Sequence, residues 1–345
     1  MNSSAVAADP GRARFARDML ALALLRAVAP FQIGSVAAVS PLMSADLRMS
    51  ATELGLLVGI YMLAGLLISI PGAAVTRRYG DLRVLCVCLV AMTAGALMLA
   101  AADGYGGALA GRAMAGCGGV IITMVTLRMA SEHFAGPRAA TGMAVVVASW
   151  PVGIGFALLA VGPLAQAIGW RSALLVPAVL PLAFLALRDW KRMAAPPAAP
   201  GRVPMLALQR HEWGAVALLC VGWFCYNGWA AAINAFTPLW FVEQGRSVAG
   251  AAAMSSVMMM SCAVALGVAA AVHPGLLAIA LAAVVSPAGR TGAFGLFSFS
   301  ANAGLLLTPV VAGALVDAAG TAGAALALGA AVAALVALGA LPHRR

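Results

Sequence analysis

Long runs of residues without Asp, Glu, Lys or Arg recur along the whole chain and limit what it can fold into. The longest covers residues 247–289, and others cover 54–76, 139–170, 213–242 and 291–316. About 20 apolar residues form a helix that crosses the hydrocarbon core of a bilayer, where the backbone must satisfy its own hydrogen bonds. With 63% hydrophobic and 9% charged residues, the chain lacks the polar surface of a soluble protein. The sequence therefore predicts an all-α polytopic membrane protein in contact with the lipid bilayer.

The net charge of +10 is distributed unevenly between the expected loops. Basic residues precede the first apolar run and fill every second loop, whereas the alternate loops hold few of them. This is the positive-inside pattern, and it predicts that both termini and the central loop lie in the cytoplasm. The expected location is the bacterial inner membrane. Because topology accounts for the basic excess, a nucleic-acid partner is not expected.

Residues 188–212 form a long polar and proline-rich segment, which predicts a cytoplasmic linker between two helical bundles. We expect an N-terminal six-helix bundle at 1–187 and a shortened C-terminal bundle at 213–345. The predicted spans lie at about 19–43, 54–76, 83–102, 105–128, 139–163, 172–188, 213–241, 263–287, 291–316 and 321–341.

The two halves of the chain repeat each other weakly, as the halves of membrane transporters often do. Pro41 and Ser50 recur 197 residues later as Pro238 and Ser247. Further along, the segment GPLAQAIG recurs 151 residues later as GALVDAAG. The change of offset means that the second half lacks 46 residues between these two anchors.

The shortfall falls within the uncharged run that begins at Ser247. Glu243 is expected outside and Arg290 inside, so an odd number of spans must join them. We expect one span near 263–287, with residues 248–262 as an extension or surface segment, which gives about ten spans, six in the first half and four in the second. Eleven spans, with a tight turn at His273-Pro274-Gly275, remain the alternative.

The loop after the second span carries a first resemblance to a known family. PGAAVTRRYGDLR at 71–83 is similar to the basic loop of the major facilitator superfamily, in which a glycine and several basic residues follow the second helix. Arg78 and Gly80 fit this pattern and Asp81 follows the glycine, although Arg77 stands where the family has an Asp. The resemblance implies a gating or structural role for Arg78, Gly80 and Asp81.

Three further motifs resemble the same family. RAMAGCGG contains Arg112 and Gly116 in the spacing of its Arg-x-x-x-Gly pattern, and GWR follows the fifth span. WPVGIG, which begins with Trp150 and Pro151, resembles the branch that carries small anions such as cyanate. The resemblance implies two helical bundles that work by alternating access as a secondary active transporter of a small solute. It also implies that a proton could couple to transport, and no cofactor or metal is expected.

Two ionisable residues lie inside predicted spans, where each costs about 2.5–3.5 kcal/mol at a helix centre and normally has a function. They are Arg26 in the first span and Arg112 in the fourth, whereas the acidic residues lie at helix ends. Fixed positive charges favour an anionic substrate or a neutral one, with an anion the preferred expectation. We expect both arginines in the substrate site. The alternative for Arg26 is that its side chain extends to the cytoplasmic surface.

Four amide side chains inside predicted spans complete the candidate site as hydrogen-bonding groups. Three of them, Gln32, Asn227 and Asn302, lie in the first, seventh and eleventh helices of the family order, and Asn234 shares a helical face with Asn227. The alternative role for all four is hydrogen bonding between packed helices, worth about 0.6–2 kcal/mol in membranes. Trp150 and Pro151 are expected to mark a kink rather than a ligand contact.

Two other functional classes can be weighed against transport. Enzymatic activity is not expected, because the chain has no HExxH motif and no Ser/His pair or paired aspartates within a span. A transport-incompetent remnant or a regulatory membrane protein of the same fold is the stronger alternative, because the second half is short by 46 residues.

Overall fold

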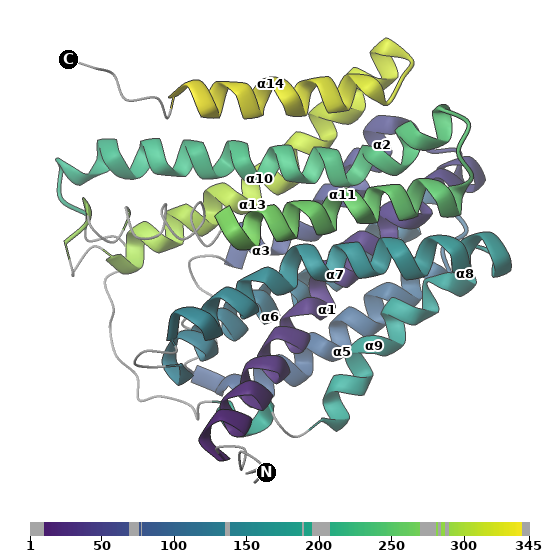
Figure 1. Ribbon diagram of the computed structural model, residues 1–345. Coiled ribbons are helices and arrows are strands. Elements are labelled where there is room, and N and C mark those ends of the chain that lie inside the picture. Colours follow the sequence, from purple (N-terminus) through teal and green to yellow (C-terminus); the bar gives the residue numbers. More distant parts are fainter. Residues whose placement is uncertain are drawn as a thin grey trace, which may run out of the picture.

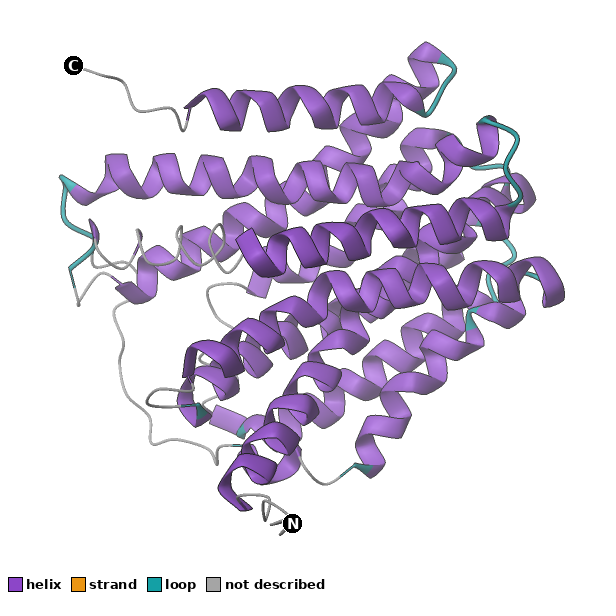
Figure 2. Cartoon of the chain, in the orientation of Figure 1, coloured by secondary structure: helices purple, strands orange, loops and turns teal. Residues whose placement is uncertain are grey.

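The computed structural model describes residues 10–68, 76, 78–134, 139–187, 190–194, 208–269, 281, 284–286 and 290–339. Within these ranges the regular secondary structure is entirely helical, and short loops join the helices (Figure 2). The all-α expectation from the sequence is thus confirmed. His273-Pro274-Gly275, where the eleven-span alternative has a tight turn, lies outside the described residues, as does Arg77.

The first half of the chain passes along the molecule six times. Its helices are α1 (Pro10–Leu47), α2 (Ala51–Gly59), which continues through the 3-10 turn η1 (Ile60–Met62) into α3 (Leu63–Ile68), α5 (Asp81–Ala100), α6 (Tyr105–His133), α7 (Ala139–Ile168), and α8 (Trp170–Ala173), which leads into α9 (Leu175–Ala186). A 3-10 turn, η3 (Trp190–Met193), follows.

The described residues of the second half pass along the molecule four times. Their helices are α10 (Glu212–Glu243), α11 (Val248–Ala269), α13 (Arg290–Ala319) and α14 (Gly323–Gly339). Across the described chain, six helices are long and apolar enough to cross a membrane, and three shorter apolar helices accompany them. These properties agree with a polytopic membrane protein of about ten spans.

The helices run side by side, so the molecule has two ends (Figure 1). The beginnings of α1 and α10 and the end of α14 lie at the left of Figure 1, which we call the termini end. The turns at residues 48–50, 101–104, 244–247 and 320–322 lie at the right, which we call the distal end. The first described helix therefore begins, and the last described helix ends, at the same end of the molecule.

Helix contacts show the internal repeat in three dimensions. Helix α1 packs along α7 in the first half, and α10 packs along α13 in the second. Two seams join the halves: α2 packs on α13, and α11 packs on α7. If α1 corresponds to α10 and α7 to α13, then α2 corresponds to α11. Among the described residues, no second-half helix then corresponds to α5 or α6.

This correspondence corrects the expectation for residues 248–262. We expected an extension or surface segment there, but helix α11 begins at Val248 and packs on α7. Most of the span predicted near 263–287 lies outside the described residues. Ala251 and Ala252 are completely buried. Charged residues alone set the limits of the predicted span, and the run of small apolar residues between them does not mark a helix start. The match of Ser247 to Ser50 in the sequence repeat is the signal that does.

Acidic side chains at the distal end confirm the two sequence offsets. Asp46, at the end of α1, accepts hydrogen bonds from the Trp170 indole, at 3.1 Å, and from the Arg171 guanidinium. At the corresponding position of α10, Glu243 accepts hydrogen bonds from the Thr321 hydroxyl and the Ala322 amide, each at 2.9 Å. The acceptors are 197 residues apart and the donors 151 residues apart, as in the sequence repeat.

Glycines allow α2 and α13 to approach each other very closely along their seam. A Cβ atom placed on Gly55 would lie 2.1 Å from the Pro309 carbonyl oxygen, and one on Gly313 would lie 2.2 Å from that of Ala51. Neither position can hold a side chain without moving a backbone, because real contacts of this kind do not fall below 3.0 Å. The distal part of this seam is therefore closed.

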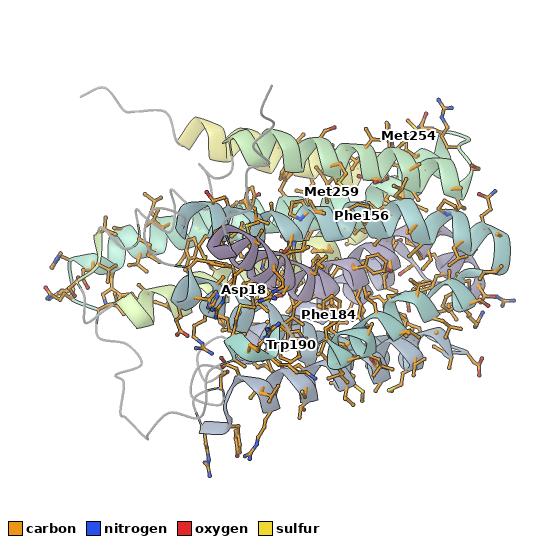
Figure 3. The ribbon with its side chains drawn as sticks, turned by 60° about the horizontal axis from the view of Figure 1, so that its bottom comes forward. Asp18, Phe156, Phe184, Trp190, Met254 and Met259 are labelled. Carbon is orange, nitrogen blue, oxygen red and sulfur yellow. The ribbon has the colours of Figure 1, made fainter. Side chains whose placement is uncertain are left out.

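At the termini end, side chains join α1 to α6 and fold the start of the linker onto the bundle. Figure 3 shows Asp18, Phe184 and Trp190 close together there. His133 Nε2 lies 3.0 Å from an Asp18 carboxylate oxygen, and the buried Trp190 indole donates to the Phe184 carbonyl at 2.8 Å. This end of the first bundle is packed as a unit.

Candidate functional site

Arg112 lies in the middle of the first bundle and is only 1% exposed. Its Nε donates to the Leu57 carbonyl at 3.3 Å and its Nη1 to the Gln32 carbonyl at 3.2 Å. The guanidinium also stacks over the Tyr61 ring, 4.4 Å from the ring centre, a favourable cation–π distance. Arg112 thus links α6 to α1 and to the point where α2 tightens into η1.

Gly116 completes this junction one helical turn after Arg112. A Cβ at position 116 would lie 2.1 Å from the Tyr61 carbonyl oxygen. The glycine therefore lets α6 approach the backbone of η1, and this approach places the Tyr61 ring beneath the Arg112 guanidinium. Both residues of the Arg-x-x-x-Gly pattern therefore take part in the same contact, that of α6 with η1.

Gln32 also points into the first bundle. Its Nε2 donates to the Met92 carbonyl of α5 at 3.2 Å and to the Pro177 carbonyl of α9 at 3.0 Å. Pro181 lies inside α9 and has no N–H, so the carbonyl four residues earlier, that of Pro177, has no helical donor. Gln32 supplies that donor.

Arg26 does the same for α7. Pro151 lies inside this helix, so the carbonyl of Val147 loses its helical partner. Nη1 of Arg26 donates to that carbonyl at 3.0 Å and to the carbonyl of Val146 at 2.8 Å. The side chain is only 6% exposed and its guanidinium lies 5.5 Å from the centre of the Trp150 ring. Arg26 therefore stays inside the bundle instead of reaching the surface.

The internal repeat supports this structural role for Arg26. At an offset of 197 residues its counterpart in α10 is Trp223, and at an offset of 151 the counterpart of Val146 in α13 is Phe297. Trp223 and Phe297 stack with ring centres 4.8 Å apart. The same helix contact is thus made by a buried cation in one half and by two aromatic rings in the other.

The three asparagines lie in the second half, Asn227 and Asn234 in α10 and Asn302 in α13. The side-chain amides of Asn227 and Asn302 each donate to the carbonyl four residues earlier in their own helices, at 2.8 Å. Asn302 also faces the first half, because a Cβ on Gly65 would lie 2.4 Å from its Oδ1. Asn234 is 5% exposed, and among the described residues its Oδ1 has no hydrogen-bond partner.

The structure thus brings together some predicted site residues and separates others. Arg112 and Gln32 line one small void of about 10 Å³ in the first bundle, which is about the volume that one water molecule needs. Arg26 pairs with Trp150. Asn302 lies at the seam, where Tyr61, Val120 and Leu306 form an apolar cluster against which Trp150 packs. This cluster, which we call the seam cluster, is the place where both bundles meet near their middle.

The basic loop predicted from the family pattern lies at the termini end. Gly80 has a φ of 79°, a left-handed conformation that favours glycine, and it precedes the first residue of α5. That residue, Asp81, is buried and forms an ion pair with Arg128 of α6. Arg78 is exposed, and its guanidinium lies 5.5 Å from the centre of the Tyr79 ring.

Two residues that the sequence interpretation missed connect the bundles at the distal end. Asp317, at the end of α13, accepts hydrogen bonds from the Ala51 and Thr52 amides at the start of α2, both at 2.8 Å. Gln166, near the end of α7, accepts one from the Ala249 amide at the start of α11, at 3.0 Å. The signal was present, since Gln166 and Asp317 occupy the same place in GPLAQAIG and GALVDAAG.

Comparison with known proteins assigns this architecture to a family. The sequence profile of the Major Facilitator Superfamily matches residues 22–271. The chain belongs to this superfamily. The match covers the first half and continues through α10 and α11. No curated protein matches the sequence significantly.

Solved structures of superfamily transporters share the fold. The peptide transporter POT in complex with sulfate aligns with a TM-score of 0.69 and 12% identity, over 93% of this chain and 94% of that chain. A bacterial homologue of the human lysosomal transporter Spinster, in an inward-facing and occupied conformation, aligns with a TM-score of 0.60 and 17% identity, over 96% of this chain and 80% of that chain. The protein is thus an integral membrane protein of a transporter family.

Proposed function

We propose that this protein is a secondary active transporter that moves a small solute, preferably an anion, by alternating access between its two bundles. The observation that carries the proposal is the pair of two-fold-related seams, α2 on α13 and α7 on α11. In transporters built from repeats, the solute binds between the repeats near the midplane and one bundle rocks against the other. The proposed solute site is therefore the seam cluster, where Tyr61 and Val120 of the first half pack with Leu306 of the second.

The preference for an anion rests on charge. Arg26 and Arg112 are buried within membrane-spanning helices, whereas the acidic side chains of the described helices lie near helix ends. Because both arginines donate to backbone carbonyls, their proposed role in the substrate site is to supply a positive field at the wall of the pathway. Asn302, which faces the first half at the seam, is the proposed contact with the solute. Gln32, Asn227 and Asn234 are proposed as further hydrogen-bonding groups.

The proposed orientation follows the basic loops. With the termini end in the bacterial cytoplasm and the distal end outside the inner membrane, the arginine-rich loops face the side that the positive-inside pattern requires. The closed distal seams then correspond to an inward-facing or occluded conformation. A proton is the proposed coupling ion, as for other superfamily members that use a proton gradient.

Uptake by purified protein in liposomes tests the proposal. Vesicles with protein should accumulate at least one of a panel of small organic and inorganic anions faster than protein-free vesicles. An imposed pH gradient should change the rate if a proton is coupled. Uptake of a neutral solute or a cation alone would retain transport but reject the anion preference, and uptake equal to empty vesicles for every solute would reject the proposal.

A transport-incompetent remnant, or a regulatory membrane protein of the same fold, is the second candidate. The observation in its favour is that the described part of the second half has no counterparts of α5 and α6. Failure of uptake for the whole panel, in vesicles where the protein is folded and correctly oriented, would favour this candidate.

A further inference from the structure

The distal contacts between the bundles form a pair related by the internal repeat. The first, which we call the α2 latch, joins Asp317 of the second half to Ala51 and Thr52 of the first. The second, the α11 latch, joins Gln166 of the first half to Ala249 of the second. The acceptors are 151 residues apart, and Thr52 and Ala249 are 197 residues apart.

The local capping of the two helices is also equivalent. Ser50 accepts a hydrogen bond from the Glu53 amide at 3.1 Å, and Ser247 accepts one from the Gly250 amide at 3.1 Å. The first N–H groups of a helix have no partner within it. In both helices the serine satisfies the third amide, and a side chain from the opposite bundle satisfies one or both of the amides before it. Each helix start is thus complete only while its seam is closed.

The two latches differ in strength. The Asp317 carboxylate accepts from two amides and from the Thr52 hydroxyl, and a negative charge at a helix N-terminus is stabilised by the helix dipole. Gln166 is neutral and accepts one hydrogen bond. Charge-assisted hydrogen bonds are roughly twice as strong as neutral ones, so the α2 latch holds its seam more firmly.

The other carboxylates at the distal end act within one bundle. Glu243 of α10 binds the start of α14, and both helices belong to the second half. Like Asp317, Glu243 is a carboxylate that accepts from a backbone amide and a threonine hydroxyl at the start of a helix. Movement of one bundle against the other breaks the contact of Asp317 but leaves that of Glu243 intact.

We infer that Asp317 and Gln166 are positioning residues that hold the distal face closed, and that their unequal strengths set how often the transporter opens toward the distal side. The inference rests on the proposed alternating-access function and deepens it, because it names the contacts that the transition must break. Removing the charge of Asp317 favours the open form, and adding a charge at Gln166 favours the closed form.

Electron spin resonance distances between the bundles test the latches. In a variant in which all six cysteines are replaced, Asp103→Cys and Gln244→Cys place one spin label on a distal loop of each half. Asp317→Asn should raise the ratio of open to closed populations about fivefold, the effect of about 1 kcal/mol at a helix terminus. Gln166→Glu should lower the ratio. Glu243→Gln, the matched control, should leave it unchanged within error.

Three results would overturn the inference: an unchanged ratio in Asp317→Asn, a shift in the same direction in both latch variants, or an equal shift in Glu243→Gln. A single closed distance in the parent and every variant, with and without transported solute, would instead reject alternating access itself. Hydrogen exchange in the full chain with its native cysteines gives a second measurement. Asp317→Asn should speed exchange at the Ala249 amide, which it does not touch, and an effect confined to Ala51 and Thr52 would contradict the latch.

Discussion

The role of Arg26 gives the sharpest mutational prediction, because two functions can be separated by a rescue. If the residue supplies the donor that Pro151 removes from α7, then Arg26→Met should lose hydrogen bonds to two carbonyls. Hydrogen bonds between membrane helices are worth about 0.6–1.7 kcal/mol each, so the loss should be about 1–3 kcal/mol of unfolding free energy. The substitution also removes a buried charge, and the folded protein then no longer bears the free-energy cost of desolvating it. This gain opposes the loss of the hydrogen bonds, so the single variant is not decisive.

The decisive measurement is therefore a double-mutant cycle. Pro151→Ala restores an N–H four residues after Val147, so the carbonyl regains a helical partner without Arg26. Arg26→Met should then cost about 0.6–1.7 kcal/mol less in the Pro151→Ala background than in the parent. Unfolding free energies of the four proteins, from reversible denaturant titrations in detergent, give this coupling. Additive effects within about 0.3–0.5 kcal/mol would refute the proline-partner role.

Two further predictions concern the junction of α6 with η1. Gly116→Ala should destabilise the protein by about 1–3 kcal/mol through overpacking against Tyr61. Gly222→Ala is the control, because a Cβ there meets nothing within 4 Å, and it should change the unfolding free energy little. Equal effects of the two substitutions would contradict the close approach of α6 to η1. Arg112→Ala should abolish uptake and lower stability, because its hydrogen bonds to carbonyls and its Tyr61 contact are lost, and Arg112→Lys should recover part, because lysine keeps the charge but not the fork. Full uptake by Arg112→Ala in liposomes would show that the charge is not needed.

The sequence predicted the architecture because it follows from composition and charge order. Apolar runs set the helices, and the offsets of 197 and 151 residues anticipated contacts as specific as those of Asp46 and Glu243. It failed at residues 248–262, because the start of α11 depends on Ser247 and on Gln166 from a distant helix. A run of small apolar residues contains no local mark of such a tertiary contact.

The site was predicted only in part. Because burying an arginine or an amide side chain is costly, the sequence indicates that the group has a hydrogen-bond partner, but it does not identify that partner. Pro151 and Pro181 each leave a free carbonyl four residues earlier, and this much can be read from the sequence. That Arg26 and Gln32 are the donors depends on how α1 packs against α7 and α9. The substrate role of Arg26, Gln32, Arg112, Asn227, Asn234 and Asn302 stays a prediction.

Counterflow in liposomes tests the central claim, transport by alternating access, most directly. Vesicles that contain purified protein are loaded with an unlabelled anion taken up in the panel and diluted into a trace of the labelled anion. A carrier that exchanges one solute for another across the membrane should concentrate the label inside above its external level, for a time, with no ion gradient. We predict this overshoot, smaller in Gln166→Glu than in the parent. A label that only approaches its external concentration would indicate a leak or channel, and no entry above protein-free vesicles would contradict transport.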